Sequence, residues 1–340
     1  PTSLSVRPGD SKAVVSFTQV TDSTHPQSTY QYSTDGGTTW LVAGQTSSPI
    51  TITGLTNGTN YTISIRAGGA GYGAASTGTA AVTGLIWDVW AKDYQTGTST
   101  WNDSSATASN VVKTGTGSVT TGSYPSSISV SGAAQFINTG FPETATTMVT
   151  TAPYTFGAWF KTTASGKIIG YEGSSAETGG SGYDRMLYVG TDGKIYYGQC
   201  SPTACGTNVL AGSTVNDGTW RFVVGVFDGA NMRLYVNGTQ VGSALGAAGS
   251  SSTYAGYWRI GGYNLNGWTA GAVDGRFTGS LGHVFVAHRA YTAAQISAMY
   301  SAEAAPYSLL PINFAAGTGA SGTMTAASAY PGSTYTLPST

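Results

Sequence analysis

The stretch VNDGTWRFVVGVFDGANMRLYVNG, residues 215–238, decides the fold of the larger part of the chain. Its Asp-Gly pairs at 217–218 and 228–229 predict tight hairpin turns, because glycine readily adopts the positive φ that such turns require. The runs between and after these pairs, 219–227 and 232–236, are rich in β-branched and aromatic residues. Alternate side chains of a strand point to opposite faces, so these runs suit half-buried strands. The stretch therefore predicts an antiparallel meander.

The order of residues in this meander resembles the laminin-G-like branch of the concanavalin A-like lectin fold. The resemblance continues in the entry strand at 85–90, in the Trp-x-Asp-x-Ser turn at 101–105 and in the closing segment at 291–300. It implies that residues 85–302 form one domain, a jelly roll of two packed antiparallel sheets.

One helix is predicted, over residues 292–301. Thr292 is the expected N-cap, and Gln295 stands where a capping box needs a glutamine or glutamate. The residues Ile296, Met299 and Tyr300 then form one apolar stripe. The helix is expected to lie against the sandwich.

Two further segments flank this domain. Residues 1–84 carry short alternating runs separated by turn signals, which is typical of a β-sandwich. They resemble bacterial fibronectin type III modules, with Leu55 and Tyr61 forming the tyrosine corner. Residues 303–340 resemble part of an internalin-type B-repeat. The unpaired edges of such a fragment favour pairing with another chain or continuation of the protein, and a Gly/Ser/Thr-rich linker is the alternative.

The predicted fold class is therefore all-β, with a fibronectin III-like sandwich, a concanavalin A-like jelly-roll sandwich and one short C-terminal helix. Charge is scarce, since 9% of the 340 residues are charged and the formal net charge is −1. This balance argues against a nucleic-acid partner and against an anionic membrane. No apolar run approaches the about 20 residues of a membrane span. The first residue, Pro1, indicates a processed protein or a piece of a longer one.

Two cysteines, Cys200 and Cys205, bracket four residues in an expected hairpin loop. They predict a disulfide whose role is to stiffen that loop. A metal is the alternative, although two thiols with no nearby histidine make a poor zinc site. The disulfide and the polar, weakly charged composition favour an extracellular location, on a cell surface or a virion.

Signals of catalysis are few. Glycan cleavage on this fold needs paired carboxylates, and the sequence has no Glu-x-Asp-x-x-Glu run. Glu172 acting with a distant aspartate is the remaining hydrolase interpretation. His283 and His288 accompany no nucleophile at a glycine-flanked elbow, so we expect them to be surface or half-buried strand residues. The protein is predicted to be non-catalytic.

Calcium and glycan binding are the candidate site chemistries. The resemblance implies one calcium at the sandwich rim, and the carboxylates available there are Asp184 and Asp274. The alternative is that both are solvated turn aspartates. Amides bind sugar hydroxyls, and aromatic rings stack on the apolar face of a pyranose. The candidate glycan residues are Tyr183, Arg185, Tyr263, Asn264, Asn266 and Trp268, with the alternative that Trp268 anchors its loop to the core.

Three functions are compatible with this sequence. The first is an extracellular adhesive or carbohydrate-binding protein whose partner is a glycan or another cell-surface polymer. The second is a structural subunit of an extracellular filament, sheath or capsid coat, which would self-associate through its terminal strands. The third is a glycoside hydrolase.

Overall fold

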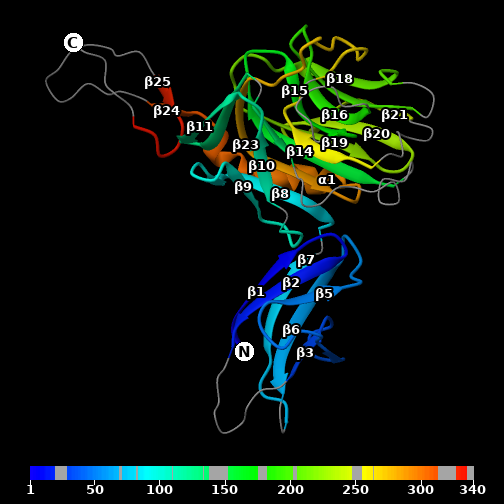
Figure 1. The fold of residues 1–340 in the computed structure, drawn as a ribbon, viewed down its shortest axis with the longest axis vertical. Coiled ribbons are helices and arrows are strands. Elements are labelled where there is room, and N and C mark those ends of the chain that lie inside the picture. Colours follow the sequence, from blue (N-terminus) through cyan, green and yellow to red (C-terminus); the bar gives the residue numbers. More distant parts are fainter. Residues whose placement is uncertain are drawn as a thin grey trace, which may run out of the picture.

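Turn pairs and alternating apolar residues fold almost the whole chain into antiparallel β-structure (Figure 1). The computed structural model describes residues 1–19, 29–68, 71–81, 83–108, 110–132, 134–137, 152–174, 182–201, 205–246, 255–262, 264–312 and 327–334. The strands form an N-terminal sandwich and a much larger body that follows it in sequence. The all-β prediction is confirmed. No helix of these residues is long and apolar enough to cross a membrane.

The N-terminal sandwich consists of two sheets that share one hydrophobic core. One sheet contains β1 (Thr2–Pro8), β2 (Lys12–Thr18) and β5 (Ile50–Thr53), and the other contains β4 (Leu41–Val42), β3 (Thr29–Ser33), β6 (Asn60–Gly68) and β7 (Ser76–Ala81). Ile63 and Ile65 are fully buried in this core, as their alternation predicts. The Tyr61 hydroxyl accepts a hydrogen bond from the N–H of Thr56 at 2.9 Å, which fastens the turn before β6.

The larger body is built from one continuous sheet of sixteen strands that folds back on itself. One half carries β15 (Gly166–Glu172), β16 (Tyr183–Val189), β17 (Lys194–Gln199), β18 (Asn208–Thr214), β22 (Tyr257–Ile260) and β13 (Gln135–Ile137). The other half carries β14 (Tyr154–Lys161), β19 (Arg221–Phe227), β20 (Asn231–Val236), β21 (Thr239–Gly246) and β23 (Gly279–Ala287). The remaining strands are β8 (Leu85–Gln95), β9 (Thr100–Asp103), β10 (Val111–Thr114), β11 (Ser118–Ser123) and β12 (Ser126–Ser131).

The meander that the sequence predicts is present as β19, β20 and β21. Val224 lies opposite Tyr235 in the first pair of strands, and Tyr235 lies opposite Gln240 in the second. The turn between β20 and β21 places Asn237 and Gly238 at φ 48° and 78°, the left-handed conformation that an Asn-Gly pair adopts most easily. The two ends of the sheet come together where β18 contacts β21, so the halves enclose one apolar core.

Helix α1 (Ala293–Glu303) covers the outer face of the strands β14, β19 and β23 (Figure 1). It begins where the sequence predicts, because the Thr292 side chain accepts from the Gln295 N–H while the Gln295 side chain accepts from the Thr292 N–H. Ile296 is fully buried and packs in the same cluster as Phe222 and Phe285. The helix ends two residues later than the predicted range.

Removal of this cap is expected to weaken the docked helix. We expect Thr292→Ala to lower the free energy of unfolding by about 1 kcal/mol, because a backbone N–H of the first turn loses its acceptor. Urea denaturation measures the change. Ser301→Ala, at the exposed far end of the same helix, is the matched control. Equal stability of the two variants would contradict the role of the capping box.

The chain then leaves the helix through the short 3-10 turn η1 (Ala305–Tyr307). The Tyr307 ring stacks on Trp159 with centroids 4.3 Å apart, which ties this segment to the outer face of the sheet. Beyond it, β24 (Leu310–Ile312) and β25 (Ala327–Ala329) form a two-stranded sheet (Figure 1). The predicted B-repeat positions 313–326 and 335–340 lie outside the described residues.

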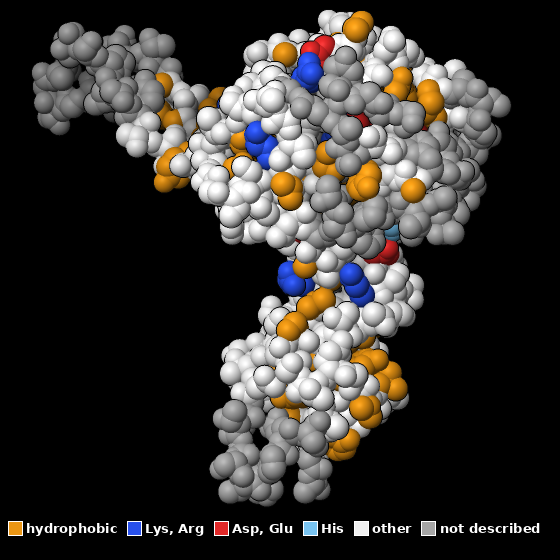
Figure 2. All heavy atoms as spheres, viewed as in Figure 1, with side chains coloured by type: hydrophobic (Ala, Val, Ile, Leu, Met, Phe, Trp, Pro, Cys, Tyr) orange, Lys and Arg blue, Asp and Glu red, His pale blue; other side chains and the backbone are white. Residues whose placement is uncertain are grey.

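Polar contacts join the N-terminal sandwich to the larger body. The Asp10 carboxylate lies 2.8 Å from His288 Nδ1 and accepts from the Asn57 side-chain amide at 2.7 Å. Backbone N–H groups of Gly84 and Ala106 donate to carbonyl oxygens in the Pro8-Gly9 turn. The hydrophobic cores on the two sides of residue 84 stay separate. The junction is therefore a polar seam, and Figure 2 shows basic, acidic and histidine side chains where the two bodies meet.

Candidate functional site

A small hollow at the rim of the larger body brings together two of the predicted glycan residues. Tyr183 and Asn266 line it together with Cys205, and its volume is about 270 Å³. Cys205 is joined to Cys200 in the predicted disulfide. Asn264 caps a turn beside the hollow, because its side-chain oxygen accepts from the Asn266 N–H at 2.8 Å. Tyr263 lies outside the described residues.

Trp268 does not present a ring to this hollow. It is 4% exposed and belongs to a buried cluster with Met186, Tyr188 and Leu265. Gly198 packs directly against the indole, which leaves no space for a side chain at that position. The alternative that Trp268 anchors its loop to the core describes its position, and the expectation of a sugar-stacking ring at Trp268 is corrected.

Asp184 and Arg185 also lie inside the fold and not at its rim. Asp184 Oδ1 accepts from the backbone N–H groups of Arg185 at 2.7 Å and Cys200 at 2.6 Å. The Arg185 guanidinium lies 5.4 Å from the ring centroids of both Tyr154 and Tyr171. The side chains of Asp184 and Arg185 are 0% and 1% exposed, so a ligand at the rim does not reach them.

The second calcium candidate, Asp274, is exposed and forms an ion pair with Arg276 at 2.8 Å. Among the described residues, no three His, Cys, Asp or Glu side chains gather as metal ligands would. Asp184 is engaged by backbone N–H groups. Calcium binding stays a prediction.

Glu172, the remaining hydrolase candidate, is 7% exposed and lies within a buried cluster of charges. It forms ion pairs with Lys167 and with Arg259, the latter at 3.0 Å. Arg259 also donates to the Gln135 side chain and to the Ser174 carbonyl oxygen. Burial, together with the Arg259 charge, lowers the pKa of Lys167 well below its usual value. This position gives Glu172 a structural role.

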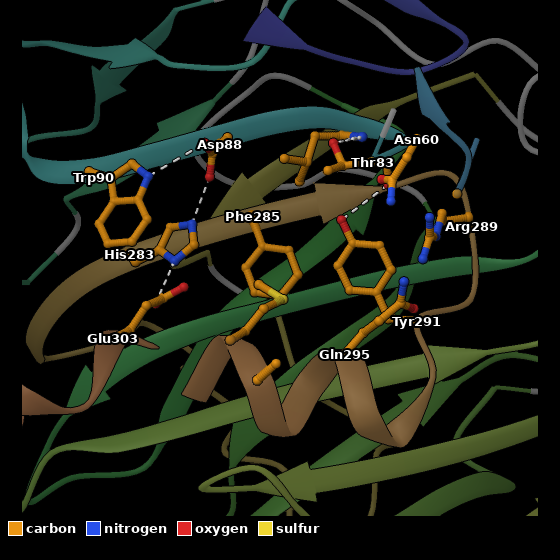
Figure 3. A pocket seen from close by; sticks show the side chains of 14 residues that line it. Asn60, Thr83, Asp88, Trp90, His283, Phe285, Arg289, Tyr291, Gln295 and Glu303 are labelled. Carbon is orange, nitrogen blue, oxygen red and sulfur yellow. Dashed lines mark hydrogen bonds and ion pairs between the residues drawn. The ribbon is translucent and has the colours of Figure 1, made fainter. Parts of the chain in front are cut away.

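The larger hollow is a groove at the junction of the two bodies, which sequence reasoning missed. Its volume is about 450 Å³, within the range of small-ligand sites. Helix α1 forms one wall, the start of β8 and residues 58–60 form the other, and β23 lies beneath (Figure 3). We call it the junction groove. Its lining residues are Gly58, Asn60, Thr83, Leu85, Asp88, Trp90, His283, Phe285, Arg289, Tyr291, Gln295, Ala298, Met299 and Glu303.

His283 dominates one end of the junction groove. Its Nε2 lies 2.7 Å from Asp88 Oδ1 and its Nδ1 lies 2.9 Å from Glu303 Oε2, as the dashed lines in Figure 3 mark. The imidazole stacks on Trp90 with ring centroids 3.8 Å apart. The Trp159 indole N–H donates to the same Glu303 oxygen at 2.8 Å. The His283 side chain, on β23, thus links β8 and the end of helix α1.

The two carboxylates keep His283 protonated. Burial alone would lower the pKa of His283, but the charge of Glu303 and the hydrogen bonds to Asp88 and Glu303 outweigh it and raise the pKa to about 9. At neutral pH the imidazolium therefore donates to both carboxylates. The expectation that His283 is a surface or half-buried residue is wrong, since it is 2% exposed. His288 is part of the junction between the two bodies, bonded to Asp10.

The other end of the junction groove is lined by amides and a cation. Asn60, Arg289 and Gln295 lie there, while Phe285 lies between them and His283 (Figure 3). The Tyr291 hydroxyl donates to the Thr83 carbonyl oxygen at 3.1 Å, which fixes its ring beside Arg289. The groove therefore combines an apolar floor with hydrogen-bonding groups at both ends.

Comparison with known protein families finds a match for part of this chain. Residues 131–297 match the family model described as the Concanavalin A-like lectin/glucanases superfamily. Just under half of the chain is matched. No curated protein matches the chain. The predicted lectin-like domain is supported over this segment.

Several solved structures resemble the chain. The binding domain of Paraclostridial Mosquitocidal Protein 1 aligns with a TM-score of 0.45 and 12% identity, over 64% of this chain and 52% of that one. Domain 4 of AbnA, a GH43 extracellular arabinanase from Geobacillus stearothermophilus in complex with arabinotriose, aligns with a TM-score of 0.44 and 14% identity. The alignment covers 64% of this chain and 98% of that one. The botulinum neurotoxin serotype D ligand binding domain in complex with N-acetylneuraminic acid aligns with a TM-score of 0.45 and 12% identity. The alignment covers 68% of this chain and 57% of that one. The chain spans about half the length of the two toxin domains, and the likeness concerns the fold alone.

Proposed function

We propose, from a concanavalin A-like lectin/glucanase domain at residues 131–297, that this protein is a non-catalytic, extracellular carbohydrate-binding protein whose sugar site is the junction groove. The shape and lining of that groove carry the proposal. Its apolar lining includes Phe285 beneath and Leu85 and Met299 on the two walls, and polar side chains stand at both ends. A sugar ring has the same distribution, with apolar C–H faces and hydroxyl groups around its edge, so the groove matches it in chemistry and size.

The engaged carboxylates support a binding function over a hydrolytic one. Asp88 and Glu303 are the acidic groups of the groove, and both are bonded to His283. Hydrolysis of a glycoside needs one carboxyl group that donates a proton and a second that acts as nucleophile or base. Carboxylates that are hydrogen-bonded to the His283 imidazolium are poorly suited to act as proton donor, nucleophile or base. The disulfide between Cys200 and Cys205 supports an extracellular location.

A glycan array probed with the full 340-residue chain tests this function. We expect the wild-type chain to bind a subset of oligosaccharides. Ala298→Trp is expected to weaken that binding at least tenfold, because Ala298 is an exposed residue of helix α1 that lines the groove. The larger side chain fills the site without disturbing the core.

Two further variants separate the possible outcomes. Ser297→Trp places the same bulk on an exposed position of the same helix that does not line the groove, and we expect it to bind as the wild type does. Tyr183→Ala removes a ring from the rim hollow. Loss of binding in Tyr183→Ala with normal binding in Ala298→Trp would place the site at the rim and contradict the proposal.

One observation favours a structural function as the second candidate. Within the described residues, β24 and β25 pair only with each other. Leu309 and Leu310 at the start of this two-stranded sheet are each 52% exposed. An open strand edge with apolar side chains is a surface on which another chain can add a strand. Light scattering tests this structural function. Long polymers of the wild-type chain that are absent in Leu310→Lys would favour a filament subunit over a carbohydrate-binding protein.

A further inference from the structure

The distribution of charge in the junction groove narrows the class of sugar that it suits. The acidic groups Asp88 and Glu303 lie at the end where His283 bonds to both (Figure 3). Arg289 lies at the opposite end. No ion pair found among the described residues involves Arg289. The groove therefore has at one end a cation that pairs with no carboxylate of the described residues, and paired charges at the other end.

The guanidinium of Arg289 is held in position by its surroundings. Its Cζ lies 4.8 Å from the ring centroid of Tyr291. On the other side it packs on Gly58, where a Cβ atom would come within 2.7 Å of Arg289 Nη1. Gly84 leaves space for the stem of the side chain, since a Cβ there would lie 3.2 Å from Arg289 Cγ. An arginine confined in this way loses little entropy when it binds an anion.

Other donors stand close to this cation. The Gln295 side-chain oxygen accepts the hydrogen bonds of the capping box, so its Nε2 group is available to a ligand. The Asn60 side chain is exposed on the facing wall of the groove. The first turn of helix α1 contains no acidic residue, and the partial positive charge of a helix start adds to the field. This end of the groove favours an anion.

We propose that the junction groove binds an acidic sugar, with its carboxylate on Arg289 and its ring against Phe285. The proposal rests on the carbohydrate-binding function proposed above and names its ligand class. A carboxylate fits because its two oxygens match the two parallel N–H groups of a guanidinium. The ring hydroxyls at the far end of the ligand then meet Asp88, which accepts hydrogen bonds. A sugar bound in the reverse direction would bring its carboxylate to Asp88 and Glu303, so the charges also fix the orientation.

The site needs both bodies of the protein. Gly58 and Asn60 come from the N-terminal sandwich, whereas Phe285, Arg289 and Gln295 come from the larger body. The polar seam at Asp10 and His288 holds these walls together. A ligand in the groove would therefore favour one arrangement of the two bodies.

Calorimetric titration of the full chain tests the ligand class. The probes are trigalacturonate, triglucuronate and the methyl ester of each, because the ester keeps the sugar and removes the charge. We expect at least one acid to bind tenfold or more tightly than its ester. In Arg289→Gln this ratio is expected to fall to about one, while Arg289→Lys retains part of it because a lysine keeps the charge and loses the paired N–H geometry.

A matched variant and three outcomes complete the test. Arg233→Gln removes a cation that is paired with Asp228 outside the groove, and it is expected to keep the ratio of the wild type. Equal binding of acid and ester would overturn the acidic-sugar inference and leave the carbohydrate-binding function standing. Selectivity for the acid that survives in Arg289→Gln would overturn the role of Arg289. A third outcome is that neither acid binds, while the array shows that the wild type binds other sugars and that Ala298→Trp loses this binding. That result would overturn the acidic-sugar class alone.

Discussion

Replacement of Glu172 by alanine is expected to lower the free energy of unfolding by about 3–5 kcal/mol. Glu172 is buried between Lys167 and Arg259, and its Oε2 lies 3.0 Å from Arg259 Nη1. Arginine stays charged at all accessible pH values, so the variant keeps a buried cation and removes the carboxylate beside it. Alanine also leaves a void in the half of the sandwich that contains β15 and β22.

Urea denaturation monitored by tryptophan fluorescence measures this loss, with each transition fitted separately because the chain has two cores. Asp217→Ala is the matched control, since it breaks the exposed ion pair with Arg221. We expect that variant to lose less than about 1 kcal/mol. Glu172→Gln keeps the shape and one hydrogen-bond acceptor, and an intermediate loss is expected. A loss in Glu172→Ala no larger than in Asp217→Ala would show that the buried cluster contributes little.

The second large effect is the loss, as the pH rises from about 6.5 to above 9, of the stabilisation that protonated His283 provides. The pKa of His283 is about 9 in the folded protein, whereas an ordinary histidine, as in the unfolded chain, has a pKa of 6.5. A raised pKa means that the folded state holds the proton more tightly, so the stabilisation is complete below pH 6.5 and is lost as the pH passes through 9. The difference corresponds to ~3 kcal/mol.

Thermal unfolding between pH 6 and pH 9.5 measures this dependence. His283→Gln is expected to be less stable than the wild type at pH 6, and the difference between the two is expected to shrink as the pH rises to 9.5. His288→Gln is the control, because His288 bonds to Asp10 at the junction and not to the helix. If the wild type and His283→Gln decline equally, the imidazolium between Asp88 and Glu303 is not the group that titrates.

Local signals in the sequence were enough to predict much of the fold. Asp-Gly and Asn-Gly pairs predict the meander of β19 to β21, because the glycine of each pair has the positive φ that its turn requires. Thr292 and Gln295 predict the start of helix α1 for a similar reason, since a capping box is complete within four residues. Both features depend on residues that are neighbours in sequence.

The site was harder to predict because its residues are distant in sequence. His283 is 195 residues from Asp88 and 20 from Glu303, and no local pattern links them. Trp268 shows the opposite difficulty, since an aromatic residue directly after the asparagine-rich turn at 264–267 suits a sugar platform and a loop anchor equally well. Its burial depends on Gly198 of a neighbouring strand. Tyr183 and Asn266, two of the candidate glycan residues, both line the hollow at the rim.

The crystal structure of the full chain with the tightest oligosaccharide from the array is the most direct test of the proposed function. We predict that one sugar ring lies in the junction groove against Phe285 and Met299, with its polar groups toward Asp88 and Arg289. A ring bound instead in the hollow between Tyr183 and Asn266, with no sugar in the groove, would contradict the assignment.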